Sequence, residues 1–293
     1  MCLELKKLRV SELTRYLYGM VLYMVLKSVL IALTLLGSFS VDAEEDFTHY
    51  AFANYLGSGI YQTSGQNATV VNIPISFELY NNDTESLTLR TPLSLGFFNF
   101  KWSDLPDGDL PSSVGTMTIT PGLEYRLRTS EDHEFQTYVD LGYGTNFTSG
   151  THVAIYSAGV SSLLDLELRQ SAPVWVNRLF FAGYASFDGT QSETYSALQS
   201  GIDIGTNMHW RWDLLGVDVE PRVFVTGYWY FDKLRFATPF GEDVLVSNSL
   251  EVGATLAFSK PILWDWMGID RLGLSVRAGD GVKVWRLIFE FPI

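Results

Sequence analysis

The chain has almost no cysteine and is short of positive charge. Its 293 residues include one cysteine, Cys2, and four histidines, and Asp plus Glu outnumber Lys plus Arg by 33 to 20, a formal net charge of −13. Binding to nucleic acid needs an excess of Lys and Arg to neutralise phosphates, so no nucleic-acid partner is expected. An acidic disordered chain is also excluded, because 47% of the residues are hydrophobic and 14% are aromatic.

Long apolar runs are missing from most of the chain. So apolar a composition would fit several membrane helices of roughly 20 residues each, but Tyr16–Phe39 is the single stretch of that kind. After it, charged residues interrupt every run before a helix could cross a bilayer. The remaining apolar residues must therefore follow another pattern.

The Tyr16–Phe39 stretch predicts export. Basic residues precede its apolar core, and small residues follow it up to Val41–Ala43. This order is typical of a cleaved signal peptide over residues 1–43, in which the first 23 residues would be an over-long extension if Met20 or Met24 is the true start. A retained membrane anchor is the alternative.

Cleavage after Ala43 would change the chemistry of the chain. It would remove five basic and three acidic residues. The exported chain would then have 15 basic and 30 acidic residues, a net charge of −15. Cys2 would leave as well, so the exported chain would have neither a disulfide nor a thiol-based site.

Beyond about residue 50 the dominant hydrophobic period is two. In Thr116–Arg128, Met117 and every second residue after it form an apolar face. Thr116 and every second residue after it form a polar and charged face. Divided at its turn-rich points, the sequence predicts twelve strands, near 52–64, 69–80, 86–100, 114–128, 134–147, 152–168, 174–187, 196–211, 217–231, 244–259, 270–279 and 282–291.

These strands predict an all-β fold, a single antiparallel transmembrane β-barrel of about 12 strands over residues 52–293. Most are as long as the roughly 9 to 11 residues of a tilted membrane-spanning strand, and strands of soluble sheets are shorter. The longest connections, Lys101–Ser113 and Asp232–Asp243, fall on the same side, and aromatic residues lie near strand ends as in interfacial girdles. A spanning sheet must close because lipid offers no hydrogen bonds to strand edges. A soluble β-sandwich is the alternative.

Three segments also resemble a known family. They are Tyr55–Tyr61 (YLGSGIY), Asn72–Phe77 (NIPISF) and Leu89–Gly96 (LRTPLSLG), and they are similar to segments of the solitary outer-membrane autotransporter β-barrel proteins of Gram-negative bacteria. The resemblance covers nearly the whole exported chain. It implies a twelve-stranded barrel in the outer membrane, like an autotransporter translocator with a narrow lumen. Because only a short segment separates Ala43 from the first strand, no passenger domain is expected.

The end of the chain fits assembly into the outer membrane. Trp285, Leu287, Phe289 and Phe291 alternate on one face, as in the final strand of substrates of the barrel-assembly machinery, although Pro292-Ile293 follow where an aromatic residue usually ends the chain. We expect Phe291 to act as the final aromatic residue. The expected partners are outer-membrane lipid and, during biogenesis, the barrel-assembly and periplasmic chaperone machinery, and the oligomeric state is open.

Residues 44–51 have two interpretations. Acidic residues at Glu44–Asp46, followed by apolar residues at helical spacing, fit a short helix that plugs the lumen, as the translocator helix does in the family. The same residues fit a periplasmic leader into the first strand.

Charged residues of both signs alternate along the candidate inward faces. They fit a structural network in which buried charges neutralise one another, because unpaired ones would cost several kcal/mol. The alternative is a narrow diffusion channel, although porin channels normally have sixteen or more strands. The candidate residues are Glu78, Arg90, Glu124, Arg126, Arg128, Asp140, Asp165, Glu167, Asp203, Arg211, Asp218, Glu220, Arg222, Glu251, Arg271, Arg277, Arg286 and Glu290.

A barrel enzyme that hydrolyses lipid or peptide is a further alternative. It would need a histidine paired with a carboxylate or a serine near the outer rim. Only His152 is expected near that rim, and no serine elbow or carboxylate cluster accompanies it in sequence. No metal-ligand spacing or phosphate-binding loop is present either, so we expect no enzyme, no metal and no cofactor.

Overall fold

The computed structural model describes one part of the 293-residue chain, all of it within the compact unit Glu45–Ile293. The expected signal peptide (1–43) and the expected leader or plug helix (44–51) lie outside the described residues. The described residues are 57–62, 67–98, 114–147, 149–166, 172–206, 208, 210–212, 216–236, 244–262, 269–280 and 282–291.

The described residues form strands joined by turns. No helix in these ranges is long and apolar enough to cross a membrane. The strands are β1 (Gly59–Gln62), β2 (Asn67–Ile73), β3 (Ser76–Asn81), β4 (Glu85–Arg90), β5 (Leu93–Phe98), β6 (Val114–Ile119), β7 (Gly122–Ser130), β8 (His133–Asn146), β9 (His152–Asp165), β10 (Val174–Ser186), β11 (Ser192–Gly205), β12 (Trp210–Trp212), β13 (Val217–Phe236), β14 (Val244–Phe258), β15 (Arg271–Gly279) and β16 (Val282–Ile288).

Four pairs of consecutive segments are single strands with a break. β2 and β3 pair with β5 and β4, and β6 and β7 both pair with β8, so the two halves of each broken strand share the same neighbouring strands. β11 and β12 likewise both pair with β13. Counted in this way, the sheet has twelve antiparallel strands, which confirms the predicted fold class.

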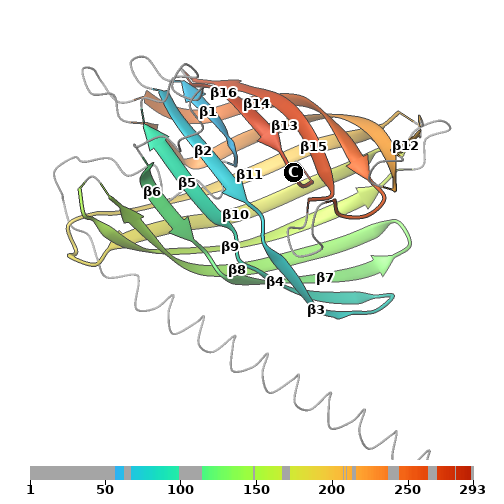
Figure 1. The fold of residues 1–293 in the computed structure, drawn as a ribbon, viewed down its shortest axis with the longest axis horizontal. Helices are drawn as coiled ribbons and strands as arrows, with labels where there is room; N and C mark the ends of the chain where they lie inside the picture. Colours follow the sequence, from blue (N-terminus) through green and yellow to red (C-terminus); the bar gives the residue numbers. More distant parts are fainter. Residues whose placement is uncertain are drawn as a thin grey trace, which may run out of the picture. The chain divides into compact units, whose positions relative to one another are not determined.

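The sheet closes into a ring between the first and the last strand (Figure 1). β1 pairs with β16 from Gly59 opposite Arg286 to Gln62 opposite Lys283, and β8 pairs with both β7 and β9 along the opposite wall. Each of the twelve strands thus has a neighbour on both sides over at least part of its length. A closed barrel leaves no unpaired strand edge, which is the condition for a sheet to lie in lipid.

Prolines cause three of the four breaks. Pro74, Pro92 and Pro121 lie between β2 and β3, β4 and β5, and β6 and β7, and each lacks the N–H that a regular ladder requires. The wall stays connected at the breaks, because the carbonyl oxygens of Pro92 and Pro121 accept bonds from Thr120 N at 3.2 Å and Leu141 N at 2.9 Å. The prolines therefore bend the strands without opening the sheet.

The two faces of the barrel differ as the alternation predicts. On β8, Gln136, Tyr138 and Asp140 are buried on the inner side, whereas Phe135 and Leu141 on the outer side are 43% and 67% exposed. The same contrast extends around the ring, where many large apolar and aromatic side chains are exposed on the outer face. Such a face matches hydrocarbon better than water.

The strand bounds differ from the predicted ones in two places. β13 runs to Phe236, five residues beyond the predicted end, because the Leu234–Phe236 segment continues to pair with β14 after an irregularity at Trp229. β16 ends at Ile288, three residues before the predicted end, because the chain bends at Phe289 and Glu290. The predicted loop 101–113 lies outside the described residues.

The tight turn between β10 and β11 is organised around the Asp188 carboxylate. Its Oδ1 accepts bonds from Ser186 Oγ at 2.6 Å, from Thr190 Oγ1 at 2.7 Å and from Thr190 N at 3.0 Å. The Ser186 bond contributes most, and together these donors lower the pKa of Asp188 from 3.8 to about 2. A carboxylate with a lowered pKa stabilises the folded turn above pH 4 and stops doing so as the pH falls through 2.

We expect the Ser186→Ala substitution to raise the pKa of Asp188 toward 3.8, because it removes the donor that lowers this pKa most. The pKa is measured from the side-chain carboxyl ¹³C shift of the folded protein in micelles. Ser192→Ala, at the start of β11, is the control and should leave the value at about 2. A pKa near 3.8 in the unsubstituted protein would contradict the described turn.

Candidate functional site

Three clusters of charged side chains lie on the inner face of the barrel, and each contains a carboxylate residue that is at most 2% exposed. The carboxylates belong to Asp140, Asp203 and Glu251, whose residues are 2%, 0% and 0% exposed. Each of them contacts at least one arginine. The pairing matters because a buried carboxylate without a partner costs several kcal/mol.

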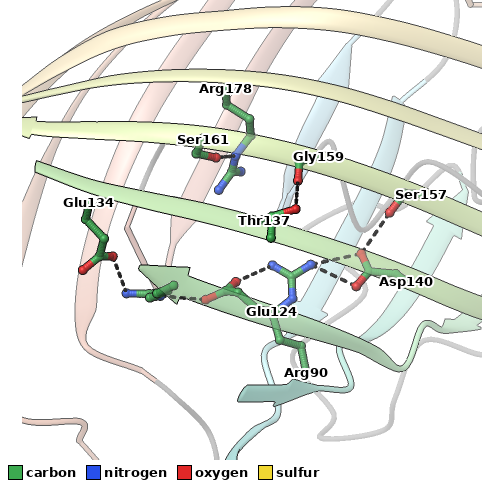
Figure 2. A network of polar contacts seen from close by, with 10 residues as sticks. Arg90, Glu124, Glu134, Thr137, Asp140, Ser157, Gly159, Ser161 and Arg178 are labelled. Carbon is green, nitrogen blue, oxygen red and sulfur yellow. Dashed lines mark hydrogen bonds and ion pairs between the residues drawn. The ribbon is translucent and has the colours of Figure 1, made fainter. Parts of the chain in front are cut away.

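The Arg90 cluster joins β4, β7 and β8 (Figure 2). Arg90 Nη1 lies 3.0 Å from Glu124 Oε2, and Arg90 Nη2 lies 3.1 Å and 3.0 Å from the two oxygens of Asp140. Arg126 Nε binds the other oxygen of Glu124 at 2.8 Å, and Arg126 Nη1 is 3.8 Å from Glu134. One guanidinium therefore bridges two buried carboxylates that would otherwise repel each other.

The local sequence makes room for this bridge. Gly122 is the register partner of Asp140, and a Cβ atom at position 122 would lie 1.9 Å from Asp140 Oδ1 and 2.5 Å from the Val139 carbonyl oxygen. Ser157 Oγ on β9 donates to Asp140 Oδ2 at 2.9 Å. The glycine thus lets the Asp140 carboxylate turn toward Arg90.

The Asp203 cluster connects strands that are distant in sequence. Asp203 Oδ2 accepts bonds from Arg222 Nε at 2.7 Å and from Arg271 Nη1 at 2.8 Å. Arg222 also binds Glu220 Oε2 at 3.0 Å and the Ala172 carbonyl oxygen at 2.9 Å. Two arginines share one fully buried carboxylate, and Glu220 balances the second positive charge.

The Glu251 cluster adds tyrosine to the same chemistry. Arg286 Nη1 and the Tyr228 hydroxyl bind Glu251 Oε2 at 2.6 Å and 2.7 Å, and Ser275 Oγ donates to Oε1 at 2.5 Å. The Arg277 guanidinium lies over the Tyr228 ring, 3.7 Å from its centre, and donates to Ser249 Oγ at 2.8 Å. A cation over an aromatic face is stabilised without a carboxylate.

Apolar and aromatic side chains form a further inward cluster, which we call the tyrosine core. Its rings are in contact, with the Tyr195 ring centre 5.7 Å from that of Phe180 and 6.0 Å from that of Tyr230. All of its members are less than a tenth exposed. They are Tyr138, Val153, Ile155, Phe180, Ala182, Tyr184, Tyr195, Ala197, Tyr228, Tyr230, Val246 and Val284.

A cavity of about 170 Å³ lies inside the end of the barrel at which β1 begins and β16 ends. Its wall includes Arg90, Arg178 and Arg286, together with Tyr138 and the segment Leu287–Phe291. Charged, aromatic and apolar groups thus meet in one space, which is large enough for a molecule of about the size of benzene.

The structure brings most of the predicted inward charges together. The three clusters contain Arg90, Glu124, Arg126, Asp140, Asp203, Glu220, Arg222, Glu251, Arg271, Arg277 and Arg286. Glu78, Arg128, Asp165 and Asp218 are exposed, and none of them belongs to a cluster among the described residues. Glu290 lines the cavity. Glu167 and the side chain of Arg211 lie outside the described part of the structure.

The sequence interpretation missed Glu134, Arg178 and the tyrosine core. On β10 the inward positions around Arg178 are Val176, Phe180, Ala182 and Tyr184, which are as apolar as the outward ones. A strand that is apolar on both faces shows no alternation between apolar and polar residues. The alternation therefore could not indicate that Arg178 points inward. The one signal in the sequence was the charge of Arg178 itself, on a strand that is otherwise apolar.

The predicted C-terminal aromatic face is present in part. Trp285 and Leu287 are 48% and 44% exposed on the outer face, as expected. Phe289 and Phe291 lie beyond the end of β16 at Ile288, and both line the cavity. The centre of the Phe291 ring lies 4.6 Å from the guanidinium carbon of Arg271, a member of the Asp203 cluster. The bend after Ile288 explains the difference.

The described histidines lie outside the clusters. His152 Nδ1 is 2.6 Å from the Tyr143 hydroxyl, and the two rings are stacked at the barrel surface. His133 contacts Ser162 and Thr129. Within the described ranges no group of three or more His, Cys, Asp and Glu residues is arranged to hold a metal ion.

Comparison with protein families gave no match, nor did comparison with curated proteins. Among solved structures, the chain is similar to the β domain of the Bordetella autotransporter BrkA, with 14% identity over 78% of this chain and 92% of that chain, and a TM-score of 0.45. It is also similar to LpxR from Salmonella typhimurium, with 10% identity over 83% of this chain and 95% of that chain, and a TM-score of 0.41.

The first neighbour is an autotransporter β domain, the class that the sequence segments resemble. The closed barrel is established by the strand pairing of this chain itself.

We expect the Arg90→Gln substitution to lower the free energy of unfolding by roughly 3 kcal/mol, the lower end of the range for breaking a buried ion pair. Arg90 is partly exposed, but its loss leaves Asp140 with Ser157 alone among the described contacts. Urea unfolding, followed by the gel shift of the heat-modifiable barrel, measures the change. Arg128→Gln is the matched control, because Arg128 is exposed and has no described ion pair. Equal stability of the two variants would contradict the role of the Arg90 cluster.

Proposed function

We propose that this chain is an integral outer-membrane β-barrel, exported through its N-terminal signal, whose interior is closed by its own side chains. In this role it resembles an autotransporter translocator without a passenger, a stable barrel that holds its outer loops at the surface. It would not serve as an open diffusion pore. Insertion by the barrel-assembly machinery, with periplasmic chaperones, is the expected route.

The outer face of the ring supports the membrane location. Leu141, Leu250, Val252 and Leu274 on β8, β14 and β15 are each more than half exposed, although they are large and apolar. Exposed apolar area on this scale marks contact with a membrane or a partner. Together with closure of the sheet and the apolar N-terminal stretch, it favours lipid as the surroundings.

The burial of the inward face carries the proposal of a closed interior. Val153, Ala182 and Ala197 have no exposed area, and Tyr195 is 2% exposed, although all four side chains point inward. The lining of a solute-conducting pore stays in contact with water. The paired carboxylates of the three charge clusters support the same conclusion, because their charges are already neutralised within the protein.

The predicted alternatives have weaker support. A narrow diffusion channel is favoured by one feature, the cavity of about 170 Å³ at one end of the barrel. A rim enzyme would need a carboxylate or a serine beside His152. The described contact of the His152 ring is with Tyr143, whose own ring stacks on Phe187. The geometry therefore best supports the function of a stable membrane barrel with a closed interior.

Recording from planar bilayers tests this proposal. We expect the purified, folded protein to give no discrete conductance steps. We expect the Tyr184→Ala, Tyr195→Ala double variant to give such steps, because it removes two rings from the tyrosine core and opens a path through the inner face.

The matched control is the Tyr143→Ala, Tyr156→Ala double variant, which removes two tyrosines from the outer face of β8 and β9. It should remain silent, and heat-modifiable mobility should confirm that all three proteins are folded. Regular conductance steps from the unsubstituted protein would overturn the proposal in favour of a narrow channel.

A further inference from the structure

Among the described residues that line the cavity beside β1 and β16, one positive and one negative group have no ion-pair partner. Arg178, on β10, donates from Nε to Ser161 Oγ at 3.0 Å and lies 5.9 Å from the centre of the Tyr138 ring. Figure 2 shows this serine contact. Within the described part of the chain its terminal nitrogens form no ion pair, unlike those of Arg90, Arg222 and Arg286.

Glu290 is the negative counterpart. It follows the bend after β16 and lines the same cavity. Arg90 and Arg178 attract its carboxylate electrostatically, and Asp270 and Glu124 repel it. Among the described residues, however, the Glu290 carboxylate makes neither a hydrogen bond nor an ion pair.

The other charged groups of the cavity wall already have ion-pair partners. Arg90 is bound to Glu124 and Asp140, and Arg286 is bound to Glu251. What remains is one guanidinium and one carboxylate that face a common space. A ligand with both charges would therefore find a complementary group for each.

Part of the remaining wall is apolar. Phe180, Ile288, Phe289 and Phe291 line the same cavity, and Arg271 holds Phe291 through its ring face. A cavity of about 150 Å³ is sufficient to hold benzene. The present cavity, of about 170 Å³, suits a molecule slightly larger than that, with one apolar group.

We propose that this cavity binds a small zwitterion with an apolar side chain, a free α-amino acid of about the size of leucine. Its carboxylate binds the Arg178 guanidinium, its ammonium group binds the Glu290 carboxylate, and its side chain packs against the phenylalanines. The site depends on the cavity alone, so it stands whether or not the barrel conducts ions.

Isothermal titration calorimetry of the folded barrel in detergent tests the site, with L-leucine as the probe. We expect saturable binding to the unsubstituted protein, and affinities lower by about tenfold or more in Arg178→Gln and in Glu290→Gln, because each loses a charge-assisted hydrogen bond. Arg128→Gln is the matched control, an arginine outside the cavity and without a described ion pair, and should bind as the unsubstituted protein does.

Two leucine derivatives separate the two contacts without changing the protein. Leucinamide lacks the carboxylate and should bind weakly, with little further loss in Arg178→Gln. N-acetylleucine lacks the ammonium group and should bind weakly, with little further loss in Glu290→Gln. Absence of saturable leucine binding to the unsubstituted protein would overturn the site, as would equal binding of leucine and both derivatives. Heat-modifiable mobility confirms that each variant is folded.

Discussion

The pairing of β1 with β16 is the contact on which the rest of the structure depends. Without it, the sheet would present two unpaired edges, and each backbone group exposed there to lipid would cost several kcal/mol. Among the described residues, β1 contributes Gly59–Gln62 to this pairing, between Lys283–Arg286 on one side and Asn67–Val70 on the other. A strand of four residues thus completes a ring of twelve. Once the ring is closed, each strand has an outer face for lipid and an inner face that the protein must fill.

The inner face is filled in two chemically different ways. The tyrosine core excludes water with aromatic and small apolar side chains from seven strands. The three charge clusters instead place arginines around buried carboxylates, where removing one partner costs more than the pair contributes. This arrangement explains why an acidic chain can bury Asp140, Asp203 and Glu251, since each is matched by an arginine on a nearby strand.

Much of the fold could be predicted from the sequence, because a sheet with one apolar and one polar face alternates visibly. Thr116–Arg128 shows both faces correctly, and twelve strands were predicted in nearly the described positions. The breaks at Pro74, Pro92 and Pro121 were not predicted, because each half of a broken strand keeps the phase of the alternation across the missing N–H. The bend that turns Phe291 inward leaves no signal in the alternation either, since the apolar period continues through it.

The types of residue in the candidate site could be predicted from the sequence. Which arginine pairs with which carboxylate could not. Asp203 and Arg271 are 68 residues apart, and their contact depends on the register of three intervening strand pairings, which single-strand periodicity does not encode. Arg178 was hidden for a different reason, because the strand around it is apolar on both faces. Residues whose role depends on what faces them across the lumen therefore require the structure.

Closure of the barrel in the membrane is tested most directly by a disulfide between its first and last strands. Ile60 and Trp285 are register partners on β1 and β16, and the described chain has no cysteine of its own. In a chain with Cys2 replaced by serine, we expect the Ile60→Cys, Trp285→Cys variant to form an intramolecular disulfide in the outer-membrane fraction. The control pair Ile60→Cys, Leu274→Cys, with its second cysteine on β15, should not. Recovery in the soluble periplasm, or a disulfide in the control pair alone, would contradict the closed membrane barrel.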